Sequence, residues 1–134
     1  TIVKRDRDHF RGCLAGGAIG DALGRPVEFL TYADIERTYG KGGIRNPACD
    51  DDGMFQVTDD TQMSLFTIEG ILRAETRGRQ KGICHPPEVV FYVYQRWLYT
   101  QGYQEPGRYP GIYDGWFCSG SGNCMHAGRP ETPA

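Results

Sequence analysis

The sharpest chemical feature of the sequence is the run Thr58-Asp59-Asp60-Thr61, in which two adjacent carboxylates are flanked by hydroxyls. Carboxylate and hydroxyl oxygens are hard ligands of the kind that Mg²⁺, Mn²⁺ and Ca²⁺ prefer. Because neighbouring aspartate side chains diverge, the pair suits two metal ions, or one ion and its water, better than chelation of a single ion. The alternative is structural, since such residues at a helix start cap backbone N–H groups and stabilise the helix by roughly 0.5–2 kcal/mol.

The elements that position this run are predicted to be helices, because apolar residues recur at helical spacing. Upstream, Gly12, Gly16, Gly20 and Gly24 occupy every fourth position, which gives one helix a face almost without side chains. A second helix or a ligand could approach such a face closely, and this contact must offset up to about 1 kcal/mol per glycine. The predicted order is helix 11–24, helix 33–39, loop 40–57, helix 58–75, linker 76–87 and helix 88–100.

Two blocks of sequence, in this order, carry a family resemblance. The first is Gly-Ala-Ile-Gly-Asp-Ala-Leu-Gly at 17–24 with Val-Glu-Phe at 27–29, and the second is Thr-Asp-Asp-Thr-Gln-Met at 58–63. Residues 10–75 thereby resemble the ADP-ribosylglycohydrolase family, which includes enzymes that remove ADP-ribose from arginine. The resemblance implies an all-α fold, here a partial orthogonal helical bundle, that holds two divalent metal ions, Mg²⁺ or Mn²⁺, beside an ADP-ribose cleft.

The resemblance also assigns roles to individual residues. Thr58, Asp59 and Asp60 match the family's first metal-binding triplet. Glu28 matches the acidic residue after the glycine block, which implies a catalytic role as proton acceptor or donor; its alternative is a solvated charge at a helix end. Gly20 and Asp21 are expected to bind substrate by shaping the wall of the cleft, although a purely structural role for Asp21 is an equal alternative.

One feature departs from the family pattern. The family completes its site with a later Asp-x-Asp-Thr segment, whereas Asp114 is the only aspartate after Asp60. We therefore expect residues 1–100 to form the N-terminal portion of such a domain with an incomplete two-metal site. Residues 101–134, rich in Gly and Pro, are expected to form an irregular tail. Many family members carry an Arg-x-Pro-Gly-Asn-Thr-Cys segment after this point. One set of codons for residues 127–134, read in another frame, encodes Arg-Pro-Pro-Gly-Asn-Thr-Cys, so we hypothesise that a frameshift made the tail non-native.

The resemblance implies a metal-dependent hydrolysis of the N-glycosidic bond that links ADP-ribose to a protein side chain, with arginine as the expected acceptor. The expected partners are an ADP-ribosylated protein or a small ADP-ribose derivative. The alternative functions are a truncated, inactive remnant and a module that binds ADP-ribose or a partner protein without turnover. A partial bundle leaves apolar surface unburied, which predicts self-association.

Composition and charge argue against other classes of protein. Fifteen Lys and Arg residues against 17 Asp and Glu give a net charge of −2, without the basic excess that nucleic acids or anionic membranes attract. No run approaches the roughly 18 apolar residues of a membrane span. The five cysteines lack paired spacing and no signal peptide is recognisable, so reduced thiols and a cytoplasmic location are expected.

Overall fold

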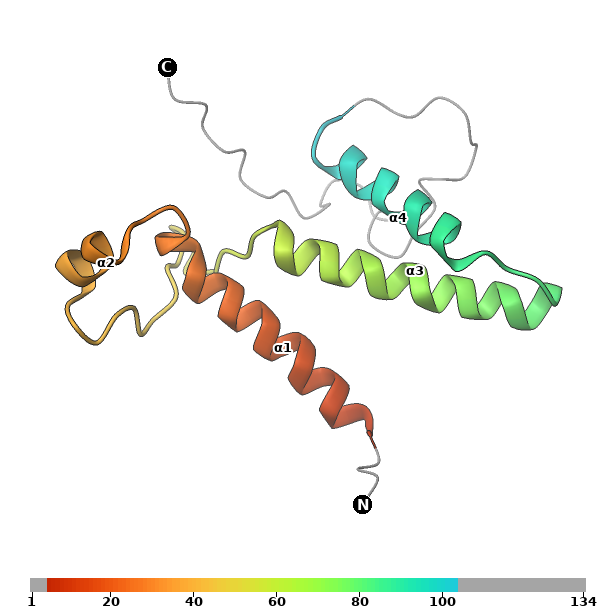
Figure 1. The fold of residues 1–134 in the computed structure, drawn as a ribbon, viewed down its shortest axis with the longest axis horizontal. Coiled ribbons are helices and arrows are strands. Elements are labelled where there is room, and N and C mark those ends of the chain that lie inside the picture. The colour runs from red at the N-terminus through yellow and green to blue at the C-terminus, as the bar shows by residue number, and fades with distance from the viewer. Residues whose placement is uncertain (1–4, 104–134) are drawn as a thin grey trace. The chain divides into compact units, whose positions relative to one another are not determined.

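A computed structural model describes residues 5–103 of the chain. Its elements follow in the order α1 (Arg7–Gly24), the 3-10 helix η1 (Arg25–Val27), α2 (Tyr32–Tyr39), α3 (Asp59–Lys81) and α4 (Pro86–Thr100) (Figure 1). Within the described part there is no strand, only an isolated bridge between Cys49 and Phe55, so the predicted all-α class is confirmed. The predicted irregular tail lies, from residue 104 onward, outside the described residues.

The chain divides into two compact units, residues 1–61 and 62–134, which we call the first and the second unit. In the first unit, α1 begins at Arg7, four residues earlier than predicted, because Asp6 and His9 form a capping box. The Asp6 carboxylate accepts hydrogen bonds from two backbone N–H groups and lies 2.7 Å from Nδ1 of His9. The α-helix ends at Gly24 as predicted, since Pro26 has no N–H to continue the ladder.

The glycine face of α1 is open. A Cβ added at any of five glycines would meet no atom within 4 Å among the described residues: Gly12, Gly16, Gly17, Gly20 and Gly24. The close approach predicted for this face is therefore not found in the described part of the chain.

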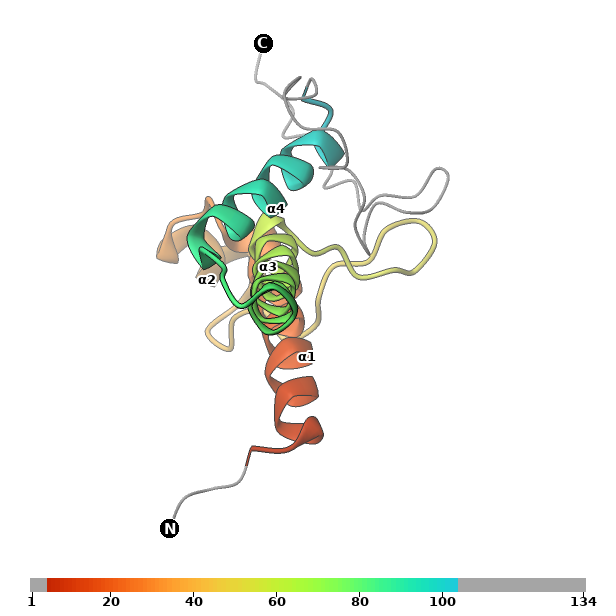
Figure 2. The ribbon, with the colours of Figure 1, turned by 90° about the vertical axis from the view of Figure 1, so that its right-hand side faces the viewer.

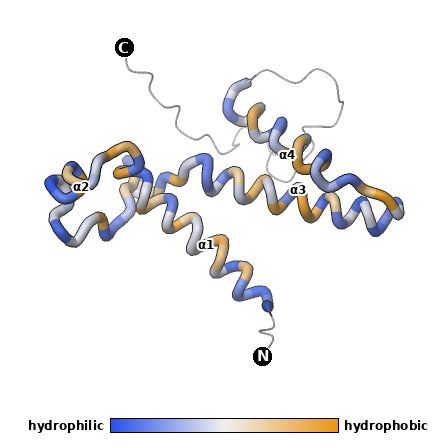
Figure 3. The backbone as a smooth tube through the Cα atoms, viewed as in Figure 1, coloured by the Kyte–Doolittle hydropathy of each residue, from blue (hydrophilic) through white to orange (hydrophobic). Residues whose placement is uncertain are grey.

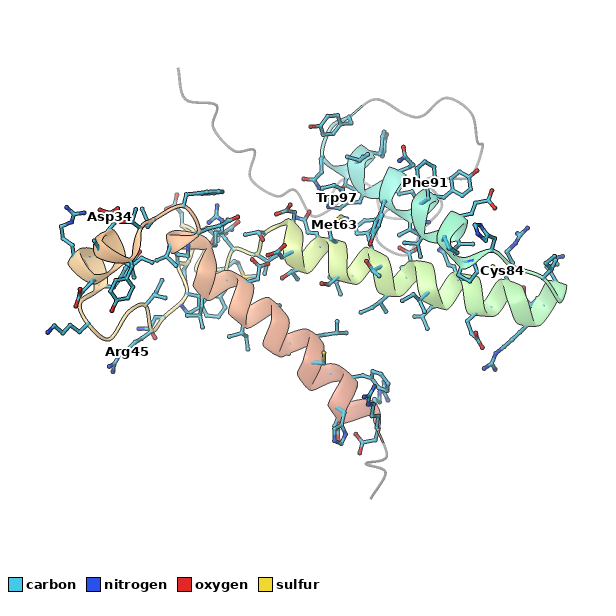
Figure 4. All side chains as sticks on the ribbon, in the orientation of Figure 1. Asp34, Arg45, Met63, Cys84, Phe91 and Trp97 are labelled. Carbon is cyan, nitrogen blue, oxygen red and sulfur yellow. The ribbon has the colours of Figure 1, made fainter. Side chains whose placement is uncertain are left out.

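Helix α2 matches its prediction closely. The Thr31 hydroxyl caps its start by accepting from Asp34 N–H, and Gly40, with a φ of 75°, ends it in a conformation that favours glycine. The following segment is the predicted loop. Its acidic turn is ordered by the Asp50 carboxylate, which accepts from the backbone N–H groups of Asp52 and Met54. Figure 4 labels Asp34 on α2 and Arg45 in the loop that follows.

In the second unit, α4 runs back alongside α3 (Figures 1 and 2). Hydrophobic and hydrophilic positions alternate along both helices (Figure 3), and Phe66, Ala74 and Val93 are buried. The helices approach closely at Gly70, where an added Cβ would lie 3.2 Å from the Cα of Val90. A side chain at this position would require α4 to shift by a few tenths of an ångström.

Polar side chains of α3 also contact polar side chains of α4. Glu69, 1% exposed, lies 2.7 Å from Arg96, 3% exposed, and also 2.7 Å from Arg73 on its own helix. The Thr67 hydroxyl lies 2.6 Å from the hydroxyl of Tyr94. These pairs fix the rotation of the two helices because a buried charge or hydroxyl without a partner is costly.

The predicted linker 76–87 is wrong, because α3 continues to Lys81 and only residues 82–85 connect the helices. Glu75 and Arg79 form an ion pair one turn apart, and Arg79 and Lys81 complement the negative end of the helix dipole. The helix ends where Gly82 takes a φ of 74°. Helix α4 begins at Pro86, two residues before the predicted helix 88–100, and ends with it at Thr100.

No helix in the described part of the chain combines the length and the apolar character that a membrane span needs. The three cysteines described there, Cys13, Cys49 and Cys84, form no disulfide.

Candidate metal and substrate site

The centre of the candidate site is the start of α3, where Thr58 acts as the N-cap. Its hydroxyl accepts a hydrogen bond from the backbone N–H of Asp60 at 3.2 Å, which is the usual geometry of a threonine cap. Asp59 and Asp60 occupy the first helical turn, and both residues are exposed. Capping, set out above as the alternative to metal binding, is thus done by the Thr58 hydroxyl, and the carboxylates of Asp59 and Asp60 take no part in it.

Asp21, in the last turn of α1, holds the start of α3 through both of its carboxylate oxygens. Oδ1 accepts from the Thr58 hydroxyl at 2.7 Å. Oδ2 accepts from the backbone N–H groups of Thr58 and Thr61 at 2.8 and 3.2 Å, and from the Thr61 hydroxyl at 2.5 Å. These contacts lie within the first unit and join residues 37 and 40 positions apart.

The charge of Asp21 is stabilised by these contacts. Partial burial acts to raise the pKa of its carboxyl, but the hydrogen bonds, led by those of the Thr61 and Thr58 hydroxyls, outweigh burial and hold the pKa below 3.8. Asp21 is therefore an anion at neutral pH, placed at the positive end of the α3 dipole.

The carboxylates of Asp59 and Asp60 form no hydrogen bond or ion pair with any residue that the structure describes. The Thr58 hydroxyl donates one proton and accepts one hydrogen bond, which leaves one of its two lone pairs uncommitted. Two carboxylates and a hydroxyl are the donor chemistry of Mg²⁺ or Mn²⁺, so the residues fit such an ion.

Among residues 5–103, no three His, Cys, Asp or Glu side chains gather into a metal-binding group. The described part of the site thus offers two acidic side chains, and an ion held by them would need water or substrate oxygens to complete its coordination, as Mg²⁺ commonly does.

Two other predicted site residues also lie in the first unit. Glu28 caps the C-terminal end of η1 and is exposed, and no hydrogen bond joins it to the triplet within the described residues. Gly20 is exposed on α1, one position before Asp21. Catalysis by Glu28 and substrate binding by Gly20 and Asp21 stay predictions.

The sequence did not reveal the contact between Asp21 and Thr61, because no periodicity links positions 40 residues apart. It also did not reveal Gln62, which is 2% exposed and accepts a hydrogen bond from the indole N–H of Trp97 at 2.9 Å. A glutamine directly after Thr61 gives no signal by itself. Only the helical register, which turns this position toward α4, identifies it as internal.

Comparisons with known proteins agree with the motif. The sequence model of the family described as ADP-ribosylglycohydrolase matches residues 3–130. Over 66 residues, or 48% of this chain and 22% of the relative, the sequence is 39% identical to an uncharacterized protein of Archaeoglobus fulgidus. Over 66 residues, or 43% of this chain and 20% of the relative, it is 41% identical to the ADP-ribosyl-[dinitrogen reductase] glycohydrolase of Rhodospirillum rubrum. The matched part thus spans about a fifth of each relative, and no solved structure matches.

Proposed function

Because this chain belongs to the ADP-ribosylglycohydrolase family, we propose that it acts in metal-dependent hydrolysis of the N-glycosidic bond between ADP-ribose and a protein side chain, with arginine as the acceptor. The observation that carries the proposal is the triplet at the start of α3, where two exposed carboxylates stand next to an oriented hydroxyl. The name of the Rhodospirillum rubrum relative supports an ADP-ribosylated protein as the class of substrate.

Thr58, Asp59 and Asp60 are the residues that would hold Mg²⁺ or Mn²⁺. A bound divalent ion supplies Lewis-acid polarisation of substrate and water oxygens. Asp59 and Asp60 contribute negative charge that no described residue neutralises, and this charge attracts a cation to the start of α3. Glu28 is the proposed acid or base, which takes a proton from the attacking water or gives one to the leaving nitrogen.

Metal binding is tested directly with Mn²⁺, whose free-ion electron paramagnetic resonance signal falls on binding. The test variant carries Asp59→Asn and Asp60→Asn, which keep the side-chain size and remove both charges. The matched control carries Asp51→Asn and Asp52→Asn, another pair of adjacent exposed aspartates in the same unit. We expect the test variant to lose Mn²⁺ binding and the control to keep it; equal affinity in both variants would contradict a site at the triplet.

Hydrolysis is then tested by incubating the protein with ADP-ribosyl-arginine, and binding is tested by isothermal titration with ADP-ribose. Both measurements are made with and without Mg²⁺. Metal-dependent release of arginine that Glu28→Gln abolishes supports hydrolysis with Glu28 as the acid or base. Metal-dependent binding of ADP-ribose without release supports the binding module instead. The binding function is considered because the described residues offer only two acidic side chains for a metal ion.

A further inference from the structure

We propose that Asp21 is a positioning residue for the metal-binding triplet. It fixes the Thr58 hydroxyl and the first turn of α3, so that the oxygens of Thr58, Asp59 and Asp60 stay available to a cation. This inference rests on the proposed function of the triplet. It assigns Asp21 a role that acts through Thr58, in place of direct contact with substrate.

The first support is the capacity of the carboxylate. An ionised carboxylate offers about four lone-pair sites. Asp21 accepts four hydrogen bonds, one at Oδ1 and three at Oδ2, all of them from Thr58 and Thr61. Oδ2 is thus fully engaged and Oδ1 keeps one lone pair. Because Thr58 and Thr61 use most of the acceptor capacity of Asp21, its contacts indicate that it holds the site together.

The second support is the orientation of the Thr58 hydroxyl. A threonine hydroxyl has one proton and two lone pairs, and it rotates freely unless these are engaged. Asp21 Oδ1 takes the proton and Asp60 N–H takes one lone pair. The remaining lone pair therefore has a fixed direction, which a neutral hydroxyl needs in order to serve as a metal ligand without losing its proton.

The third support is the source of the hydrogen-bond acceptors at the start of α3. The first backbone N–H groups of α3 need acceptors, which side-chain oxygens at a helix start usually supply. Here the Thr58 hydroxyl accepts from Asp60 N–H, and Asp21 accepts from Thr61 N–H. Because these acceptors come from outside the helical segment, neither Asp59 nor Asp60 is used for capping, and both carboxylates stay available to a cation.

The test measures the dissociation constant of Mn²⁺ for Asp21→Asn in the full chain. Asparagine keeps the size of the side chain, but its NH₂ group cannot accept a hydrogen bond, so the contacts of one carboxylate oxygen are lost. Residues that hold metal ligands in place change metal affinity by about 10- to 100-fold when replaced. We expect a loss of affinity in this range and a changed spectrum of the bound Mn²⁺.

The matched control is Thr61→Val, which removes one hydrogen bond to Asp21 and leaves both contacts to Thr58. We expect the Mn²⁺ affinity of this variant to stay within about threefold of the wild type. If Asp21→Asn also stays within threefold, or if both variants lose affinity in proportion to their loss of stability, Asp21 has a merely structural role and the proposal is overturned.

Folding of each variant is checked by far-ultraviolet circular dichroism. Where Asp21→Asn does not fold, Asp21→Glu decides, because it keeps the charge and the acceptors but displaces them by one methylene. Weakened Mn²⁺ binding in Asp21→Glu supports the proposal and unchanged binding overturns it. If the wild type binds no Mn²⁺, the proposed function fails together with this inference. If the Asp21 variants bind Mn²⁺ normally and the variant with Asp59→Asn and Asp60→Asn does not, this inference alone fails.

Discussion

Replacing Gly70 with alanine should reveal how closely α3 and α4 approach. A Cβ at this position would lie 3.0 Å from Cγ2 of Val90, 3.2 Å from its Cα and 3.4 Å from Cγ2 of Val93. The contact with Val90 Cα is the decisive one, because a backbone atom cannot rotate away and α4 itself must shift. In the same helix Gly78 serves as a matched control, since an added Cβ there meets only the Cβ of Cys84, at an ordinary 3.8 Å.

The expected magnitude combines two opposing contributions to the free energy of unfolding. Alanine is favoured over glycine inside a helix by about 1 kcal/mol. Overpacking of a tight contact typically costs about 1–3 kcal/mol. Gly78→Ala, which has only the first contribution, should stabilise the protein by up to about 1 kcal/mol, whereas Gly70→Ala should range from neutral to about 2 kcal/mol less stable.

Urea unfolding followed by the fluorescence of Trp97 measures this difference in the second unit. The other of the two tryptophans in the sequence is replaced by Trp116→Phe, so that the signal comes from α4 alone. The midpoints of the two alanine variants should differ by on the order of 1 M urea. Adding Val90→Ala to Gly70→Ala should restore part of the loss, since it removes one of the close atoms. Equal stabilisation by Gly70→Ala and Gly78→Ala would refute the close approach.

Three further outcomes are expected. Glu69→Leu should lower the free energy of unfolding by about 3–5 kcal/mol, because the buried Arg96 loses the carboxylate 2.7 Å away; a loss below 1 kcal/mol in urea unfolding would contradict this. Gly82→Ala should cost about 1–2 kcal/mol, since its φ of 74° disfavours a side chain, and an unchanged thermal midpoint would count against that conformation. The pKa of Asp6 is held below 3.8, first of all by its contact with His9, so its cap is intact above pH 3.8 and is lost as the pH falls through the lowered value; a titration of the His9 amide resonance that follows the unperturbed carboxyl would oppose this.

Local patterns were sufficient to predict most of the helices. Glycine and proline mark the ends of α1 and α2, and apolar spacing identifies the first part of α3. The residue types of α4 alone do not distinguish a helix from a strand, because β-branched and aromatic residues also suit a strand. The pair Pro86-Pro87 resolves it, since proline is accepted in the first turn of a helix and is disfavoured inside a sheet.

The errors have identifiable physical causes. The last turn and a half of α3 carries few apolar residues, so periodicity could not detect it, and ion pairing such as that of Glu75 with Arg79 sustains it instead. In the site, the residue types of the triplet were evident from the sequence. Its connection to Asp21 was not, because the two segments meet only after the intervening chain has folded back.

The hydrogen bonds between Asp21 and Thr58 also affect how far the segment between them can vary in length. Four hydrogen bonds hold together the two ends of the excursion 22–57, which lies between Asp21 and Thr58 and contains η1, α2 and the acidic loop. Chain entropy penalises a longer flexible loop only weakly, by about 0.6 kcal/mol for each doubling. Insertions between α2 and Thr58 should therefore leave the triplet where it is. Surface elements can therefore be added to this excursion while the oxygens at the start of α3 keep their geometry.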